Sequence, residues 1–188
     1  MKKKLQDKLL IFKDEKYDLK NTIYMLLLIM VISAFFGFIY ETFFYRIDLG
    51  YFVKRGSTFG PWIPIYAFGG LAITLFTYRL KKHTLLVFVI NCIVTGILEY
   101  ATGLVFWECF HKRLWDYNVE IWNFGNINGY ICLRSVLFFG LSSLFLIYGI
   151  IPILKKVKVK MPEKNLAIIS CILGLLFFID MIAYMILK

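Results

Sequence analysis

Charged residues make up only 18% of the 188 residues, and the chain has two histidines, four prolines and four cysteines. Acidic residues are especially few: 12 Asp and Glu stand against 22 Lys and Arg, which gives a formal net charge of +10. No G-x-x-x-x-G-K-[ST] sequence is present, so the chain cannot bind ATP through a P-loop. No G-x-S-x-G sequence is present either, which excludes the nucleophile motif of the α/β-hydrolases.

Apolar residues dominate the amino-acid composition. Hydrophobic residues fill 60% of the chain, aromatic residues fill 19%, and the mean hydropathy is +0.72. This apolar share is far above that of soluble domains, so a soluble protein is excluded. No soluble face is left on which a basic patch could follow nucleic-acid phosphates. The composition therefore predicts a small polytopic membrane protein, with the lipid bilayer as its partner and no nucleic acid.

Five apolar windows are candidates to cross a hydrocarbon core of roughly 30 Å, which takes about 20 residues as a helix. They are residues 22–45, 62–78, 84–107, 130–154 and 166–187. The second is the shortest, and Pro61, Pro64, Gly69 and Gly70 mark it as an interrupted helix. We predict an all-α fold in which residues 22–188 form one transmembrane domain of five spans. Four spans with a re-entrant segment are the alternative.

Lysine and arginine gather on one side of this arrangement. Seven precede the first window, three lie in residues 79–82 and five in residues 155–164, which is fifteen of the 22. Because basic loops stay in the cytoplasm, we expect a cell-membrane protein with its N-terminus inside and its C-terminus outside. Residues 1–21 would be a cytoplasmic segment, either an amphipathic helix on the inner leaflet or a solvated charged tail.

Four ionisable side chains interrupt the predicted spans: Glu41, Glu99, Arg134 and Asp180. Each costs a few kcal/mol inside a bilayer, so such residues usually face a cavity or a partner. All four are displaced toward the outer side, which predicts a shared, outward-facing polar cavity. Three acids against one arginine favour a cation, a proton or an ion as its ligand. In the alternative, these charges only hold the helices together.

Two stripes of polar or small residues support this prediction, because residues four apart share a helix face. Small residues on such a stripe allow helices to approach closely, and polar residues provide hydrogen-bonding neighbours for a carboxylate. The stripes are Ser33, Gly37, Glu41 and Tyr45, and Asn91, Thr95, Glu99 and Gly103.

Two long loops lie on the predicted outer side. Gly56, Gly60 and Pro61 impose turns on the first, residues 46–64. The second, residues 108–129, carries aromatic residues among Asp and Asn side chains, namely Trp115, Tyr117, Trp122 and Phe124. Such aromatics either anchor the loop at the headgroups or close over the cavity as a lid.

Metal and disulfide chemistry have weak support in the sequence. Glu108 and His111 form E-x-x-H with Asp116 nearby, but one histidine and no second cluster do not make a metal site, and no cofactor is expected. Cys109 and Cys132 flank the second loop and would pair only if it faced an oxidising exterior.

An ordered series of motifs is more specific than the composition. It consists of G-F-I-Y-E-T from Gly37, R-G-S-T-F-G-P-W-I-P-I-Y from Arg55, L-E-Y-A-T-G from Leu98, W-D-Y from Trp115 and N-I-N-G-Y-I-C-L-R-S from Asn126. With these motifs, residues 33–140 resemble the ABC-transporter type IV, or CmpB-like, family of integral membrane proteins. The chain departs from the family at Tyr130, where the family tends to have arginine, and at residues 122–126, which lack its Pro-Phe-Asn run.

The resemblance implies a permease-like protein, and any ATP-driven role would need a separate ATPase subunit. Together with the intramembrane charges, its family positions give the predicted substrate-binding residues and loop positions. These are Glu41, Arg55, Glu99, Trp115, Asp116, Tyr117, Asn128, Arg134 and Asp180 for binding, and Gly56, Gly60, Pro61 and Gly129 for the loops. The leading hypothesis is a transport component for a small molecule or an ion, with no catalytic residue assigned. A membrane-embedded enzyme acting on a lipid or headgroup through Glu41 and Glu99 is the second hypothesis. A structural or regulatory subunit is the third.

Overall fold

Helices make up nearly all the regular structure in the computed structural model, which describes residue 12 and residues 18–188. Four helices are long and apolar enough to span a membrane: α2 (Leu19–Leu49), α4 (Thr84–Phe110), the continuous helix Leu133–Lys160 and α7 (Glu163–Leu187). Extended pairing in the described residues is limited to an isolated bridge between Ile127 and Ile131. The predicted all-α, polytopic fold is confirmed.

Helix α2 begins and ends at residues whose chemistry sets its limits. The side chain of Asp18 accepts a hydrogen bond from the amide of Asn21 over 2.8 Å and caps the first turn. Gly50 ends the helix with a left-handed φ of 80°. The helix is thus longer than the predicted span, residues 22–45. The predicted amphipathic N-terminal segment falls mostly outside the described residues.

The second apolar window forms a short helix. Helix α3 (Pro64–Thr77) has 14 residues and is followed by a 3-10 turn, η2 (Tyr78–Leu80). At about 1.5 Å per residue, α3 is roughly 21 Å long, which is less than the roughly 30 Å of a hydrocarbon core. Pro64 stands in its first turn, where a missing amide hydrogen costs nothing. The interruption expected from Pro61 and Pro64 therefore appears as a helix too short to span alone.

The third long helix changes from α-helical to π-helical geometry near its middle and then returns to α-helical geometry. Helix α5 (Leu133–Phe145) passes through a π-helical segment, η3 (Leu146–Ile150), into α6 (Ile151–Lys160). Pro152 lacks an amide hydrogen, and it lies just after this π segment. The helix starts three residues later than the predicted span, residues 130–154, and extends six residues further.

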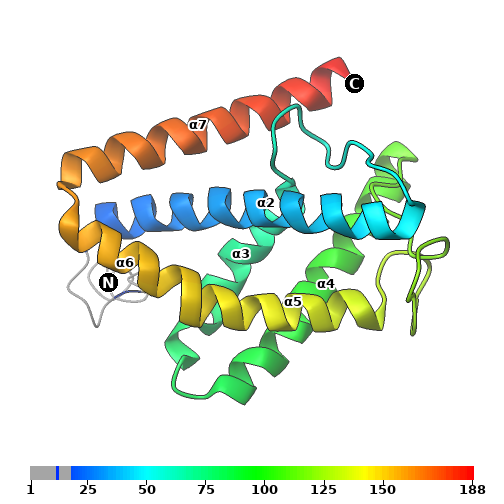
Figure 1. Ribbon diagram of the computed structural model, residues 1–188, viewed down its shortest axis with the longest axis horizontal. Helices are drawn as coiled ribbons and strands as arrows, with labels where there is room; N and C mark the ends of the chain where they lie inside the picture. Colours follow the sequence, from blue (N-terminus) through cyan, green and yellow to red (C-terminus); the bar gives the residue numbers. More distant parts are fainter. Residues whose placement is uncertain (1–11, 13–17) are drawn as a thin grey trace.

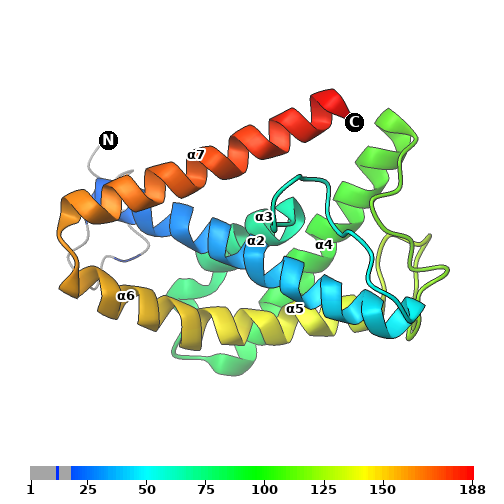
Figure 2. The ribbon, with the colours of Figure 1, turned by 45° about the horizontal axis from the view of Figure 1, so that its top comes forward.

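Three of the long helices run lengthwise and the rest of the bundle crosses them. Helices α2, α7 and α5–α6 lie along the long axis, and α3 and α4 are steeply inclined to them (Figure 1). Helix α2 packs against α3 and α7, and α4 packs against α5 and α3. The loops after α2 and α4 lie at the same end as the C-terminus, and the α6–α7 turn lies at the other (Figure 2). The two loops expected on the outer side thus lie together at one end of the bundle.

Small residues bring α2 and α3 into close contact. A Cβ atom added to Gly37 would stand 2.1 Å from Cγ of Tyr66, and one added to Gly70 would stand 2.1 Å from Oγ of Ser33. Neither glycine therefore tolerates a side chain without movement of its neighbour. The stripe from Ser33 to Tyr45 faces α3 and carries Glu41 toward the centre of the bundle.

Candidate functional site

Glu41 on α2 pairs with Arg55 in the loop that follows this helix. Nε of Arg55 donates a hydrogen bond to Oε2 of Glu41 over 3.0 Å. The guanidinium carbon of Arg55 also lies 3.5 Å from the centre of the Tyr45 ring, one turn after Glu41. The side chains of Arg55 and Glu41 are only 19% and 16% exposed. The pair compensates the charge of a buried carboxylate and ties the loop to α2.

A second ion pair joins the loop after α4 to the first turn of α5. Nη2 of Arg134 donates to Oε2 of Glu120 over 2.6 Å, and the Glu120 side chain is only 4% exposed. The hydroxyl of Tyr45 donates to the other oxygen of Glu120. The guanidinium carbon of Arg134 lies 4.1 Å from the centre of the Phe44 ring. A carboxylate from a loop is therefore buried between α2 and α5.

Glu99, on α4, is bound by hydroxyl groups. It is 3% exposed, and no cation pairs with it among the residues that the structure describes. The hydroxyl of Tyr117 donates to Oε1, and Oγ of Ser135 donates to Oε2 over 2.8 Å. Burial raises the pKa of Tyr117 well above its ordinary value, so its hydroxyl keeps its proton for this bond. Two hydroxyls stabilise the carboxylate but leave its charge uncompensated.

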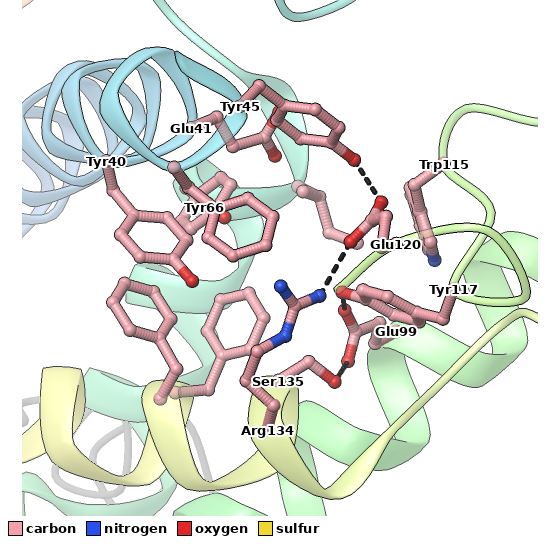
Figure 3. A pocket seen from close by; sticks show the side chains of 14 residues that line it. Tyr40, Glu41, Tyr45, Tyr66, Glu99, Trp115, Tyr117, Glu120, Arg134 and Ser135 are labelled. Atoms are coloured by element: carbon pink, nitrogen blue, oxygen red, sulfur yellow. Dashed lines mark hydrogen bonds and ion pairs between the residues drawn. The ribbon is translucent and has the colours of Figure 1, made fainter. Parts of the chain in front are cut away.

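These three carboxylates surround one small cavity of about 30 Å³ (Figure 3). It is lined by Tyr40, Glu41, Phe44, Tyr45, Ile65, Tyr66, Glu99, Trp115, Tyr117, Glu120, Arg134, Ser135, Phe138 and Phe139. A buried water needs about 10–15 Å³ of such space, so the cavity has room for about two waters. Helices α2 to α5 form its walls, and the loop between α4 and α5 covers it with Trp115, Tyr117 and Glu120.

The charges and donors of the cavity are not balanced. Three carboxylates face two guanidinium groups, that of Arg134 inside the cavity and that of Arg55 behind Glu41, which leaves a net charge of −1 when all are ionised. Nε and Nη1 of Arg134 are buried and have no acceptor among the described residues. Buried donors are nearly always bonded in proteins. The net charge of the cavity therefore favours a positive charge or a proton beside Glu99.

Comparison with known proteins places the chain in a family. Residues 28–185, which run from α2 to α7, match the family model described as Putative ABC-transporter type IV. The chain belongs to this family. No curated protein and no solved structure matches it. Membership of the ABC-transporter type IV family confirms the resemblance seen in the motifs, and together with the four long apolar helices it identifies a multi-pass membrane protein.

In this ABC-transporter type IV protein, six of the predicted binding residues gather at the cavity. Five of them line it, and Arg55 adjoins it through its pair with Glu41. The five are Glu41, Glu99, Trp115, Tyr117 and Arg134. Trp115 is fixed by a hydrogen bond from Nε1 to the carbonyl of Tyr130 over 3.0 Å. Residues far apart in the sequence are thus brought to one point between the helices.

Asp180 lies outside the lining of this cavity. Oδ1 accepts the amide of Phe59 over 2.9 Å, and Oδ2 accepts the amide of Gly60 over 2.7 Å and Nε1 of Trp62 over 2.5 Å. Asp180 thus anchors the first loop to α7. The predicted turn residues of this loop fit that role, since Gly56 has a left-handed φ of 85° and Gly60 supplies one of the two bound amides.

Pro61 completes the same turn. It stands between Gly60, whose amide binds Asp180, and Trp62, whose amide donates to the carbonyl of Gly60 over 3.0 Å. A Cβ atom on Gly60 would lie 2.9 Å from Oδ2 of Asp180, so a side chain at this position would clash with the Asp180 carboxylate.

Asp116, Asn128 and Gly129 shape the second loop. Oδ1 of Asp116 lies 3.1 Å from Nη1 of Arg113, which also donates to the carbonyl of Asn128 over 3.3 Å. Asn128 and Gly129 have left-handed φ angles of 56° and 76°. A Cβ atom on Gly129 would lie 2.4 Å from Nη1 of Arg113. These residues position the part of the loop that covers the cavity.

The sequence also raised metal binding and disulfide formation. No cluster of three or more His, Cys, Asp or Glu side chains that could hold a metal occurs in the described part of the chain. Cys109 is exposed, Cys132 is buried, and both are free thiols.

Sequence reasoning missed Glu120 and Ser135 in the cavity. Glu120 lies in a loop without periodicity, so nothing in its spacing indicates burial; only its place among aromatic residues was a signal. Ser135 follows Arg134 directly and could have been noticed from that neighbour. Tyr40 and Tyr66 also line the cavity, but nothing in the sequence distinguishes them from the many other aromatic residues of the apolar windows.

Proposed function

We propose that this protein is a permease-like transport component of the cell membrane, and that its outward-facing polar cavity binds a small cation or a proton beside Glu99. The proposed orientation places the N-terminus in the cytoplasm and the C-terminus outside. Glu41, Arg55, Trp115, Tyr117 and Arg134 would complete the binding site.

The observation that carries this proposal is the unequal pairing of the three carboxylates. Glu41 is paired with Arg55 and Glu120 with Arg134, whereas Glu99 has only hydroxyl donors among the described residues. An isolated buried carboxylate is so costly that it takes up a proton or a counter-ion. Ionisable groups within membrane-spanning helices commonly mark ion pathways and proton relays.

The size of the cavity limits what it can hold. About 30 Å³ admits a proton with a water, a bare monovalent cation or an ammonium group, and excludes a larger organic solute. The rings of Tyr40, Tyr66 and Tyr117 line the same space, and aromatic rings attract cations. A larger solute would require the loop that carries Trp115 and Glu120 to move outward.

Energy for transport would come from outside this chain. The sequence has no P-loop, so ATP-driven transport requires a separate ATPase subunit. The surfaces available to such a subunit at the predicted cytoplasmic end are the turn of residues 79–83 and residues 155–165, which comprise the end of α6, the short connection and the start of α7. The carbonyl of Lys81 accepts a hydrogen bond from the hydroxyl of Tyr148 over 2.9 Å, which holds the turn of residues 79–83 against the helix that continues into α6.

Cation binding can be tested without a partner subunit. Tryptophan fluorescence of the purified protein in detergent would be followed while NH4⁺, Na⁺ or K⁺ is added at constant ionic strength, with Trp115 in the cavity wall as reporter. We expect a saturable change that is lost in Glu99→Gln and kept in Glu108→Gln, which neutralises an exposed acid on the same helix. Equal responses in the two variants would overturn the proposal.

Orientation can be tested with reporters fused after Lys188. We expect alkaline phosphatase, which is active only outside the cytoplasm, to be active there, and green fluorescent protein to be dark. The opposite pattern would reverse the proposed topology and make the cavity inward-facing.

A further inference from the structure

The hydroxyl of Ser135, one of the two that bind Glu99, has a second acceptor within reach. Its Oγ lies 2.8 Å from Oε2 of Glu99 and 2.8 Å from the carbonyl oxygen of Cys132, three residues earlier in the chain. Ser135 and Glu99 are both buried, with exposed fractions of 5% and 3%. A serine hydroxyl has a single proton, so it can donate to only one of these oxygens at a time. Its proton can therefore turn between the carboxylate and the backbone.

Each orientation of this hydroxyl leaves its neighbours hydrogen-bonded. When Ser135 donates to Glu99, the carbonyl of Cys132 still accepts the amide of Val136 over 3.1 Å. When Ser135 donates to Cys132 instead, its Oγ can accept a hydrogen bond from a protonated Oε2 of Glu99. In both cases the hydroxyl of Tyr117 donates to Oε1. The surroundings of Glu99 thus satisfy both the ionised and the protonated form of its carboxyl group.

The other charged groups near Glu99 are paired with one another. Glu41 binds Arg55 and Glu120 binds Arg134, and the tyrosine hydroxyls are neutral at ordinary pH. The titratable and charged groups around Glu99 are Tyr40, Glu41 and Tyr45 on α2, Tyr66 on α3, Tyr117 and Glu120 in the loop after α4, Cys132 and Arg134 at the start of α5, and Arg55 behind Glu41. Within the described part of the chain, Glu99 is the acid of this group that pairs with no cation.

The space beside Glu99 is too small to hold several ligands. Glu99, Ser135 and Tyr117 all line the cavity of about 30 Å³, which admits one bare monovalent cation or about two waters (Figure 3). The carboxylates exceed the guanidinium groups by one charge, so a single positive charge neutralises the site. A carboxyl group must lose its proton to bind a cation, and cation binding therefore releases protons. A proton and a cation would thus compete for Glu99.

We propose that Glu99 binds a proton and a small monovalent cation in turn, so that the protein exchanges one for the other, with Ser135 as a positioning residue. With the cation bound, Glu99 is ionised and Ser135 donates to it. With the proton bound, Glu99 donates to Ser135, and Ser135 donates to the carbonyl of Cys132. One proton leaves to solvent for each cation that enters, so the charge of the site stays constant. The inference rests on the proposed function, which places a cation or a proton beside Glu99, and it allows a proton gradient to drive transport.

Proton release on cation binding would be measured with a pH-indicator dye in a weakly buffered solution of the purified protein in detergent. Na⁺ or K⁺ would replace choline, which is too large for the cavity, at constant ionic strength. At a pH where Glu99 is mostly protonated, we expect release of about one proton per protein molecule. Glu99→Gln should release none, and Glu108→Gln, which changes an exposed acid on the same helix, should release as much as the unchanged protein.

The pH dependence of Na⁺ binding tests the competition itself. In titrations followed by the fluorescence of Trp115, the apparent affinity should fall about tenfold for each unit of pH below the midpoint of proton binding, because one proton leaves per cation. By reciprocity, saturating Na⁺ should move the midpoint of proton binding to lower pH. Glu99→Gln should lose both effects.

Matched serine variants test the role of Ser135. Ser143 lies on the same helix, is also buried, and donates to the carbonyl three residues before it over 2.6 Å, but it is not in the lining of the cavity. Ser135→Ala removes a donor from the ionised carboxylate, so the midpoint of proton binding should rise by about one pH unit. Ser135→Thr keeps a hydroxyl and should restore the midpoint, and Ser143→Ala should leave it unchanged. Equal midpoints in Ser135→Ala and Ser143→Ala would overturn the role given to Ser135.

The failures of the two proposals are distinguishable. Na⁺ binding that depends on Glu99 but has the same affinity at every pH and releases no proton overturns the exchange and leaves the proposed function standing. A fluorescence response to pH through Glu99, with no response to Na⁺ or K⁺ at any pH, also overturns the exchange. The absence of any response that depends on Glu99, to cations or to pH, overturns both proposals.

Discussion

Asp180 and Gly60 are 120 residues apart in the sequence, yet the amide of Gly60 donates a hydrogen bond to Oδ2 of Asp180 over 2.7 Å. The same carboxylate also holds Phe59 and Trp62, so one side chain on α7 fixes the turn of the first loop. This loop carries Arg55, the partner of Glu41. An acid that the sequence marks as a membrane-embedded charge thus supports the candidate site from a distance.

Removing this carboxylate should loosen the first loop. We expect Asp180→Ala to lower the free energy of unfolding by about 2 kcal/mol, because charged hydrogen bonds to two amides and an indole are lost. Trypsin should then cut after Lys54 or Arg55 faster than in the unchanged protein. Glu163→Ala, at the exposed other end of α7, is the control and should change neither quantity appreciably. An unchanged cleavage rate in Asp180→Ala would contradict the anchoring role.

The buried pair of Arg134 and Glu120 should show strong coupling. Arg134→Met leaves Glu120 buried without its cation and should cost about 3–5 kcal/mol of unfolding free energy. The double variant with Glu120→Gln should cost much less than the sum of the two single changes, measured by thermal melting in detergent. Arg113→Met and Asp116→Asn form the control cycle, because that pair is about 30% exposed and should contribute less than about 1 kcal/mol. Additive effects at Arg134 and Glu120 would refute the coupling.

The close contact between α2 and α3 should not tolerate a methyl group. A Cβ atom on Gly37 would lie 2.1 Å from the ring of Tyr66, which lines the cavity. Gly37→Ala should therefore destabilise the protein by about 1–3 kcal/mol, as overpacked cores do. Gly149→Ala is the matched control, since its nearest neighbour would be 3.4 Å away. Equal melting temperatures for the two variants would show that α2 and α3 are not packed this closely.

The first turn of α2 should respond to pH through Asp18. Its hydrogen bond from the amide of Asn21 holds the pKa of the Asp18 carboxyl below its ordinary value of 3.8. A lowered pKa means that the cap stabilises the helix above pH 3.8 and is lost as the pH falls through the lower folded value. The protection factors of the amides at the start of α2, which are the intrinsic exchange rates divided by the observed ones, should thus fall in acid, and Asp18→Ala should show lower protection at neutral pH, with a cost of about 1 kcal/mol. Asp18→Asn keeps an acceptor without titrating, so an acid response that persisted in it would exclude Asp18 as the cause.

The site could be predicted only in part because its residues come from two kinds of segment. Glu41 and Glu99 lie on helical stripes, where a spacing of four residues already indicates a shared face. Asp180 lies on a helix as well, but spacing within α7 says nothing about which loop reaches it. Glu120 lies in a loop, where no periodic pattern distinguishes a buried carboxylate from an exposed one.

The sequence by itself determined the fold class, the family and the positions of the long helices. Long apolar segments allow no other structure in a bilayer, because every backbone hydrogen bond must be made within the segment. Tertiary structure decided which charges meet. Arg134 binds Glu120 rather than an acid on another helix, Arg55 turns inward to Glu41, and Glu99 receives only hydroxyl donors among the described residues. Such pairings depend on distances of 2.6–3.0 Å between segments far apart in the chain, and these distances are set by how helices and loops pack in three dimensions.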